Sequence, residues 1–151
     1  GVTPPVLTMV TGPAYAEFTE GLGDLANGVS SATWWHHATA YTNAVGVWGS
    51  TAEFYKDFVT KFGSDPDYVH GSCAAAADVL VNAVKTAKTK AKAKVRDALP
   101  ATDILTFYGP IDFGDNGMNQ GREMPIIQVQ DKAIKVLYPA AIADAKVITI
   151  K

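Results

Sequence analysis

The sequence predicts an α/β fold, and three features of its 151 residues carry this prediction. An apolar segment, an amphipathic segment and a β-branched segment follow one another over residues 6–35, as in a strand–helix–strand unit. The middle of the chain has helical periodicity with start and stop signals. From residue 107 onward, short alternating segments separated by turn sequences are typical of β-hairpins.

The first unit begins with a strand at residues 6–10, which we expect to be buried because it is wholly apolar apart from Thr8. Prolines precede it, and Gly12-Pro13 ends it. Residues 29–35 are rich in β-branched and aromatic side chains and form the next predicted strand. Because a helix joins the two strands, they should pair in parallel through a right-handed crossover.

The helix of this unit is predicted over residues 14–25. Four apolar side chains recur there at intervals of three and four residues, which places them on one helical face. They are Tyr15, Phe18, Leu22 and Leu25. Asn27-Gly28 ends the helix in the manner of a left-handed cap.

Residues 36–48 have no clear period and are interpreted as a connecting segment. A helix should follow, because Ser50 and Glu53 have the spacing of a capping box. Its apolar face is marked by phenylalanines four residues apart, and Gly63 ends it. These phenylalanines are Phe54, Phe58 and Phe62.

A second helix is predicted to begin at Asp65 as the N-cap, with Pro66 in its first turn. Its predicted buried stripe includes Cys73, which we therefore interpret as an inert core thiol. The full stripe is Val69, Cys73, Ala76, Ala77, Leu80 and Val84. A third, short helix over residues 92–99 should end before Pro100.

The last third of the chain is predicted to be β-rich. A strand lies within residues 107–113, and Asp115-Asn116-Gly117 has the sequence of a tight turn. Residues 126–130 and 133–138 should form a hairpin that turns at Asp131-Lys132. A final short strand is expected at residues 146–150.

Composition excludes several classes of function. A formal net charge of −2 gives no field for nucleic acid or an anionic membrane. The lysines at positions 88, 90, 92 and 94 are better explained as a solvated surface. One cysteine allows neither an internal disulfide nor a paired-cysteine metal site. The sequence contains no apolar run long enough to span a bilayer, and no signal peptide is expected within this chain.

Three groups of segments resemble, in order and spacing, the branched-chain amino-acid-binding branch of the type I periplasmic solute-binding proteins. The first comprises residues 1–8, Gly12 and residues 23–29. The second comprises residues 54–63 and 66–68 with the alanine-rich helix that follows. The third comprises residues 95–99, 107–113, 116–117 and 125–130. The resemblance extends over almost the whole chain.

This resemblance implies a partial type I periplasmic-binding-protein fold, in which hinge strands join two three-layer α/β/α lobes and the ligand lies in the cleft. It implies that residues 1–35 belong to the second lobe and residues 36–48 to a hinge crossing. It assigns residues 49–121 to the C-terminal part of the first lobe, and residues 122–151 to the return into the hinge and second lobe. The family's N-terminal portion has no counterpart here and would be a partner of this chain.

The function implied by the resemblance is that of a periplasmic substrate-binding component of an ABC-type uptake system. Its solute would be a branched-chain or aromatic amino acid or a related small carboxylate, and its protein partner the membrane permease. We expect no enzymatic activity, cofactor or metal. One alternative is a ligand-sensing domain of the same fold in a signalling receptor. Another is an α/β enzyme, but neither a nucleophile elbow nor a phosphate loop is present.

Three candidate ligand-binding residues follow the first strand, where an α/β sheet offers its binding crevice. Gly12 would let a ligand approach the backbone, and Tyr15 could face the cleft or pack in the core. Thr11 stands where the resembled family often has an acidic residue, a departure that weakens the case for an ordinary α-amino acid. Alternatively, its hydroxyl caps the following helix.

Two aromatic residues complete the candidate site. Tyr68 aligns with a family aromatic that packs on the ligand side chain, although it could instead pack on the preceding helix. Trp34 and Trp35 should point to opposite faces of their strand, and Trp35 is the one proposed to face the cleft. The adjacent His36 and His37 cannot easily share one metal ion from a strand.

Overall fold

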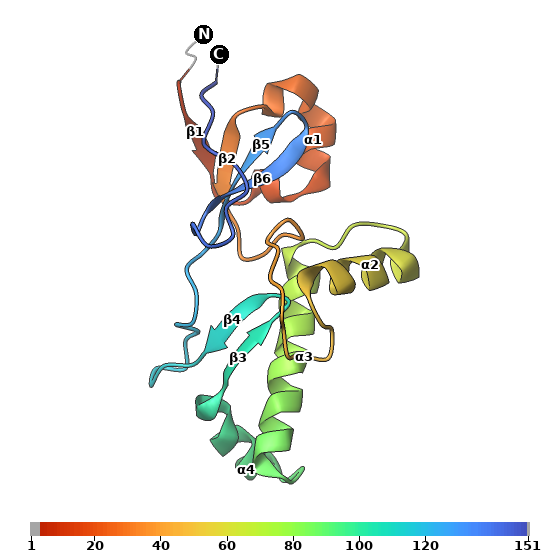
Figure 1. Cartoon of the computed structure of the whole chain (residues 1–151), viewed down its shortest axis with the longest axis vertical. Helices are drawn as coiled ribbons and strands as arrows, with labels where there is room; N and C mark the ends of the chain where they lie inside the picture. The colour runs from red at the N-terminus through yellow and green to blue at the C-terminus, as the bar shows by residue number, and fades with distance from the viewer. Residues whose placement is uncertain (1–3, 151) are drawn as a thin grey trace. The chain divides into compact units, whose positions relative to one another are not determined.

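The computed structural model describes residues 4–150 and divides into two compact units. The first unit contains residues 4–39 and 124–150, so it is built from both ends of the chain. The second unit is the continuous segment Ala40–Glu123. Both units combine helices with β-structure, which confirms the predicted α/β class (Figure 1).

The first unit is organised around a four-stranded sheet in the order β1-β2-β5-β6. These strands are β1 (Leu7–Met9), β2 (Val29–Ala32), β5 (Ile126–Gln130) and β6 (Ala133–Tyr138). β1 and β2 pair in parallel, with Leu7 opposite Val29, as the strand–helix–strand pattern predicts. β5 pairs antiparallel with both β2 and β6 (Figure 1). Segments from the two ends of the chain therefore share one sheet.

The prediction that the first strand is buried is wrong. All of β1 is exposed, and Leu7 and Val10 expose 42% and 75% of their surface. β1 is an edge strand, so it has a partner on one side only. The buried cluster of this unit gathers elsewhere, where Ala14 packs with Ile127 of β5 and Val136 of β6.

The predicted helix over residues 14–25 is broken into three pieces. They are a 3-10 turn η1 (Gly12–Ala14), α1 (Ala16–Leu22) and a second 3-10 turn η2 (Gly23–Ala26). Tyr15 has an extended backbone, with φ −104° and ψ 140°, which separates the first two pieces. These breaks put the predicted apolar face out of phase, so Leu22 and Leu25 are 43% and 81% exposed.

The hairpin of β5 and β6 is confirmed. Asp131 and Lys132 both have positive φ, 51° and 65°, as a tight hairpin turn between right-twisted strands requires. Residues 146–150 do not form the predicted strand. The buried Gln128 side chain replaces a backbone ladder there, because its amide group donates to the Ile148 carbonyl and accepts from the Ile148 amide.

In the second unit, α2 (Thr51–Phe62) begins and ends where the sequence predicts. The Ser50 hydroxyl accepts from the Glu53 amide, and the Glu53 carboxylate accepts from the Ser50 amide at 2.7 Å. Gly63 closes the helix in the left-handed conformation, with φ 71°. Phe54 is the buried member of the phenylalanine series, and its ring stacks on Phe107 at 4.0 Å.

The long helix α3 (Tyr68–Ala87) begins two residues later than predicted, so the assignment of Asp65 as its N-cap is wrong. Asp67 is the cap, and its carboxylate accepts from the amides of Val69 and His70 at 2.8 and 3.0 Å. Pro66 therefore precedes the helix instead of opening it.

The predicted buried stripe of α3 is also wrong. Val69 and Leu80 are 47% and 55% exposed, and Cys73 is an exposed thiol and not a core residue. The buried positions are Gly71, Ala75, Asp78, Val79 and Ala83. These residues are small apart from Asp78 and Val79, so the segment that precedes α2 approaches closely and Trp48 donates to the Ala74 carbonyl at 3.1 Å.

The rest of the second unit begins with α4 (Lys92–Ala98), as predicted, followed by a 3-10 turn η3 (Leu99–Ala101). Val95 and Ala98 of α4 pack against Ala83 of α3. The chain then forms an antiparallel pair, β3 (Asp103–Thr106) and β4 (Gly109–Asp112), of which the sequence predicted only the second strand. The predicted tight turn at residues 115–117 is confirmed, since Gly117 has φ 75° and donates to Gly114.

Candidate functional site

Thr11, Gly12 and Tyr15 lie together in the first unit, between β1 and α1. The Thr11 carbonyl accepts from the Ala14 amide at 3.0 Å, while its hydroxyl forms no cap, so the alternative interpretation of Thr11 as a side-chain cap is wrong. The space beside Gly12 is occupied, because a Cβ there would meet the Phe18 ring at 3.1 Å and Met9 at 3.5 Å. Gly12 thus lets a phenylalanine approach the backbone in this structure.

Trp35 has no exposed surface, whereas the adjacent Trp34 is 41% exposed. The predicted strand over residues 29–35 ends at Ala32, so both tryptophans lie beyond β2 and strand alternation does not apply to them. The buried one is the residue proposed to face the cleft. Thr33 fixes Trp35, since the Thr33 hydroxyl donates to the Trp35 carbonyl at 2.9 Å. Trp35 therefore serves the core in this conformation, and a solute cannot touch it unless the surrounding residues move.

His36 and His37 form a ring pair with centroids 4.1 Å apart. Burial, with a smaller contribution from the neighbouring His37, lowers the pKa of His36 from 6.5 to about 3. His36 is thus neutral near pH 7, and its Nδ1 accepts from the Ala38 amide at 3.1 Å. Among the described residues no group of three or more His, Cys, Asp or Glu side chains is placed to hold a metal ion.

Tyr68 lies in the second unit, at the first position of α3, and is partly buried. One turn later, the Ser72 hydroxyl donates to the Tyr68 carbonyl at 2.7 Å. The same hydroxyl lies 3.0 Å from the Tyr108 hydroxyl. Ser72 therefore connects the backbone at the start of α3 to the β3–β4 hairpin.

Tyr108 is fixed at the tip of this hairpin. The Thr106 hydroxyl accepts from the Tyr108 amide at 3.2 Å and donates to the Gly109 carbonyl at 2.9 Å. The Tyr108 ring is 8% exposed and carries the Arg122 guanidinium above it, 4.1 Å from the centroid. This distance is that of a cation–π contact.

Tyr41 is the second tyrosine beside Arg122. Reciprocal hydrogen bonds hold its backbone to Thr51, whose amide donates to the Tyr41 carbonyl and whose hydroxyl accepts from the Tyr41 amide. Burial raises the pKa of Tyr41, and the nearby Arg122 charge opposes this effect. Gly109 lies between the two side chains, since a Cβ there would meet the Tyr41 ring at 2.9 Å and the Arg122 stem at 3.1 Å.

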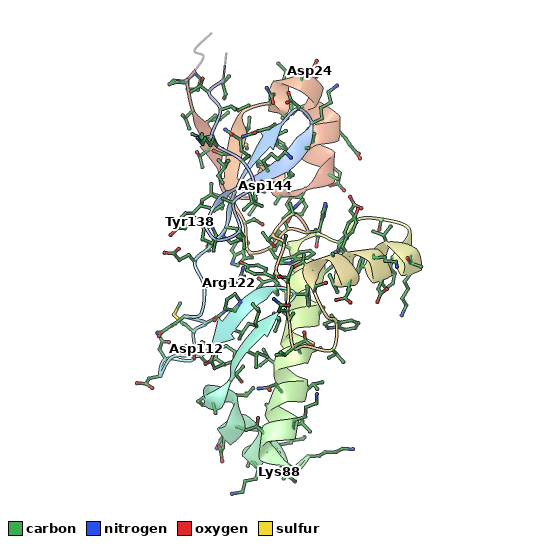
Figure 2. The ribbon with its side chains drawn as sticks, in the orientation of Figure 1. Asp24, Lys88, Asp112, Arg122, Tyr138 and Asp144 are labelled. Carbon is green, nitrogen blue, oxygen red and sulfur yellow. The ribbon has the colours of Figure 1, made fainter. Side chains whose placement is uncertain are left out.

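Arg122 lies in the segment after β4, which returns alongside the β3–β4 hairpin (Figure 2). The Asn119 side chain accepts from the Asp112 amide and donates to the Pro110 carbonyl, which docks the returning chain onto β4. A Cβ added to Gly121 would lie 2.9 Å from the Asp112 amide nitrogen, so the glycine lets the chain come this close to β4. We call Tyr41, Tyr108 and Arg122 the tyrosine–arginine cluster.

The sequence predictions missed all three members of this cluster. Tyr41 falls in an aperiodic segment, and Arg122 follows a polar turn sequence, so neither lies in a motif. Gly109 and Gly121 are the one signal that could have found them, because glycines on either side of a strand mark close approach of other groups.

A shallow surface hollow of about 350 Å³ in the first unit contains none of the predicted site residues. It is lined by Asp24, Asn27, Asp131 and Lys132, and the Asp24 carboxylate pairs with the Lys132 ammonium at 3.1 Å.

None of the helices described here is both long and apolar enough to cross a membrane.

The fold of the chain resembles several solved structures. A putative branched-chain amino acid ABC transporter protein from Silicibacter pomeroyi matches with a TM-score of 0.72 and 18% identity, over 95% of this chain. The leucine-binding protein LivK from Thermotoga maritima matches with a TM-score of 0.67 and 18% identity, over 85% of this chain. LivJ from Streptococcus pneumoniae, solved in complex with isoleucine, matches with a TM-score of 0.65 and 16% identity, over 89% of this chain.

The chain spans 40%, 35% and 37% of the lengths of these three structures, respectively. The fold is thus a partial type I periplasmic-binding-protein fold, as the sequence predicts. A family model described as periplasmic binding protein matches residues 1–133. The chain belongs to the periplasmic binding protein family.

Proposed function

We propose that this chain forms part of the substrate-binding component of an ABC-type uptake system and catalyses no reaction. The observation that carries this proposal is the family match over residues 1–133. It is supported by the fold, because similar structures include a leucine-binding protein and a protein in complex with isoleucine. The proposed solute is a branched-chain or aromatic amino acid, or a related small carboxylate.

In this proposal, residues 1–35 belong to the second lobe of the complete protein and residues 49–121 to the first. Residues 36–48 form a hinge crossing, and residues 122–151 return to the hinge and second lobe. Sequence corresponding to the remainder of the fold would supply further ligand contacts. The solute would stabilise a closed form that a membrane permease recognises, and the protein would act in the periplasm.

Each unit offers residues for solute binding. In the first unit these are Thr11, Gly12 and Tyr15, which lie together after β1. In the second unit Tyr68 offers an aromatic surface with a polar tip at the start of α3. Trp35 would support the site from the core, because its side chain is fully buried.

A thermal-shift screen of this chain against amino acids and aromatic acids tests the proposal. A solute that binds only the folded state raises the melting temperature in proportion to the logarithm of its concentration. We expect leucine, isoleucine or an aromatic amino acid to do so. If no such solute raises the melting temperature while a panel of hydrolase substrates is turned over, the enzyme alternative replaces this proposal.

A further inference from the structure

The Arg122 guanidinium has no counter-ion in the described part of the chain. No carboxylate pairs with it, and its contacts are the Tyr108 ring and the neighbouring Tyr41 phenol. Its Nη1 atom is enclosed and has no hydrogen-bond acceptor among the described residues. By contrast, the other arginine, Arg96, is exposed and forms an ion pair with Asp97.

The surrounding groups supply hydrogen-bond donors without a matching acceptor. The Tyr41 hydroxyl is enclosed and has no hydrogen-bond acceptor among the described residues, because the Arg122 guanidinium beside it is itself a donor. The Ser72 hydroxyl donates to the Tyr68 carbonyl, so the proton between Ser72 and Tyr108 comes from Tyr108. Tyr41 and Arg122 therefore retain donors, and a group that accepts hydrogen bonds is the missing chemistry.

An anion fits this arrangement better than a neutral acceptor. Holding an uncompensated guanidinium against an aromatic ring in a partly buried site costs free energy unless a negative charge approaches it. The Arg122 side chain as a whole is only partly buried, so an anion from solvent can reach its outer edge. A carboxylate matches the planar guanidinium with two parallel hydrogen bonds.

The guanidinium is also held in place before any ligand arrives. The Tyr108 ring lies under it, and Tyr108 itself is fixed by Thr106 and Ser72. Tyr41 is tied to Thr51 through its backbone. Such preorganisation lowers the entropic cost of binding.

We propose that Arg122, positioned by Tyr108 and Tyr41, is a binding site for the carboxylate of a small organic acid. Arg122 contacts the carboxylate, and Tyr41 and Tyr108 act as positioning residues. The identification of this carboxylate with that of the transported solute rests on the proposed function. The binding of a free carboxylate at Arg122 does not.

The test uses nuclear magnetic resonance of the arginine Nε–H groups in the isotopically labelled chain. The chain contains two arginines, so Arg96 is an internal control in every spectrum. The probe is sodium isovalerate at constant ionic strength, and isovaleramide is the matched neutral compound. We expect the Arg122 signal to shift saturably with isovalerate and to stay in place with isovaleramide. The Arg96 signal should drift without saturation.

Two variants separate binding from folding. Arg122→Lys keeps the charge but loses the paired geometry, and we expect about tenfold weaker isovalerate binding, followed through the Gly109 amide. Tyr41→Phe keeps the ring and removes the hydroxyl, and we expect weakening of about threefold. Arg96→Lys should bind as the unaltered chain does. Unchanged melting temperatures would show that each variant is folded.

Three results would overturn the proposal: no saturation at Arg122, an equal response to isovaleramide, or undiminished binding by Arg122→Lys. A second titration, with L-leucine, separates this proposal from the proposed function. If L-leucine binds and the Arg122 signal stays in place, this site is wrong and the function stands. If isovalerate saturates Arg122 and no amino acid binds, the site stands and the proposed solute is wrong.

Discussion

The Asp78 carboxylate accepts a hydrogen bond of 2.6 Å from the Val47 amide, although Asp78 lies in the middle of α3 and is 2% exposed. Burial raises the pKa of Asp78, and the Val47 hydrogen bond and the Lys85 charge oppose this effect. Gly46 lies directly against the same carboxylate, where any side chain would collide with it. Asp78 therefore fastens the segment before α2 to the long helix.

Replacing Asp78 tests this attachment. Asp78→Ala leaves the Val47 amide without its acceptor, and we expect the free energy of unfolding to fall by about 1–3 kcal/mol. Asp78→Asn keeps an oxygen acceptor and removes the buried charge, so it should be less harmful. Chemical denaturation measures both, with Asp57→Ala on the exposed face of α2 as the control. Equal losses in all three variants would contradict a specific role for this carboxylate.

Gly109, which lies against the tyrosine–arginine cluster, should tolerate replacement poorly. It has φ 114°, and a Cβ would meet Tyr41 at 2.9 Å and Arg122 at 3.1 Å. Gly117→Ala is a matched control, since Gly117 has φ 75° and open space around it. We expect Gly117→Ala to cost about 1 kcal/mol of unfolding free energy through backbone strain alone, and Gly109→Ala to cost clearly more. Equal costs would mean that the two side chains are not held against Gly109.

His36 should make the chain less stable in mild acid. Its pKa is about 3 in the folded state and near 6.5 when unfolded, so the unfolded state binds a proton first as the pH falls. Stability is therefore full above pH 6.5 and falls as the pH drops toward 3, by at most about 1.4 kcal/mol per pH unit. Below pH 3 this contribution stops changing.

Urea unfolding at a series of pH values measures this effect. Carboxylates also respond to acid, so the informative quantity is the difference between the unaltered chain and His36→Gln. We expect His36→Gln to have the shallower slope between pH 6.5 and 3. Parallel curves for the two proteins would refute a buried neutral His36.

Gln128 should control the order of residues 146–150. Its buried amide nitrogen donates to the Gly28 and Ile148 carbonyls, and its oxygen accepts from the Ile148 amide at 2.9 Å. Gln128→Met keeps the length of the side chain and removes these bonds. We expect hydrogen exchange at the Ile148 amide to accelerate at least about tenfold, whereas Gln120→Met on an exposed turn should not change it. Unchanged exchange at Ile148 would show that other contacts hold this segment.

The elements that the sequence predicts well are those fixed by local chemistry. The capping box at Ser50 and Glu53, the left-handed Gly63 and the hairpin turn at Asp131 act over a few residues, so their signals are complete in the sequence. The parallel pairing of β1 and β2 follows from the helix that joins them.

Burial was harder to predict, because it depends on which residues approach from elsewhere. The apolar stripe through Cys73 and Leu80 satisfies helical periodicity, yet in this chain the opposite, smaller face of α3 is the one covered. An aspartate is not expected in a core from its residue type alone. Asp78 is buried because its carboxylate accepts a hydrogen bond from the Val47 amide.

The candidate site shows the same limit. Strand alternation predicts that one of Trp34 and Trp35 is buried, but it does not say which, and β2 ends at Ala32, before both residues. The tyrosine–arginine cluster combines residues up to 81 positions apart, from Tyr41 to Arg122, and only the fold brings them together.

The most direct test of the central claim is equilibrium dialysis of this chain against radiolabelled L-leucine. Because the chain spans 35–40% of the length of similar structures, it supplies part of the contacts and we expect weak, millimolar affinity. We expect saturable uptake to one site per chain, displaced by unlabelled L-isoleucine. Equal radioactivity on both sides of the membrane up to about 10 mM leucine, with folded protein, would contradict it.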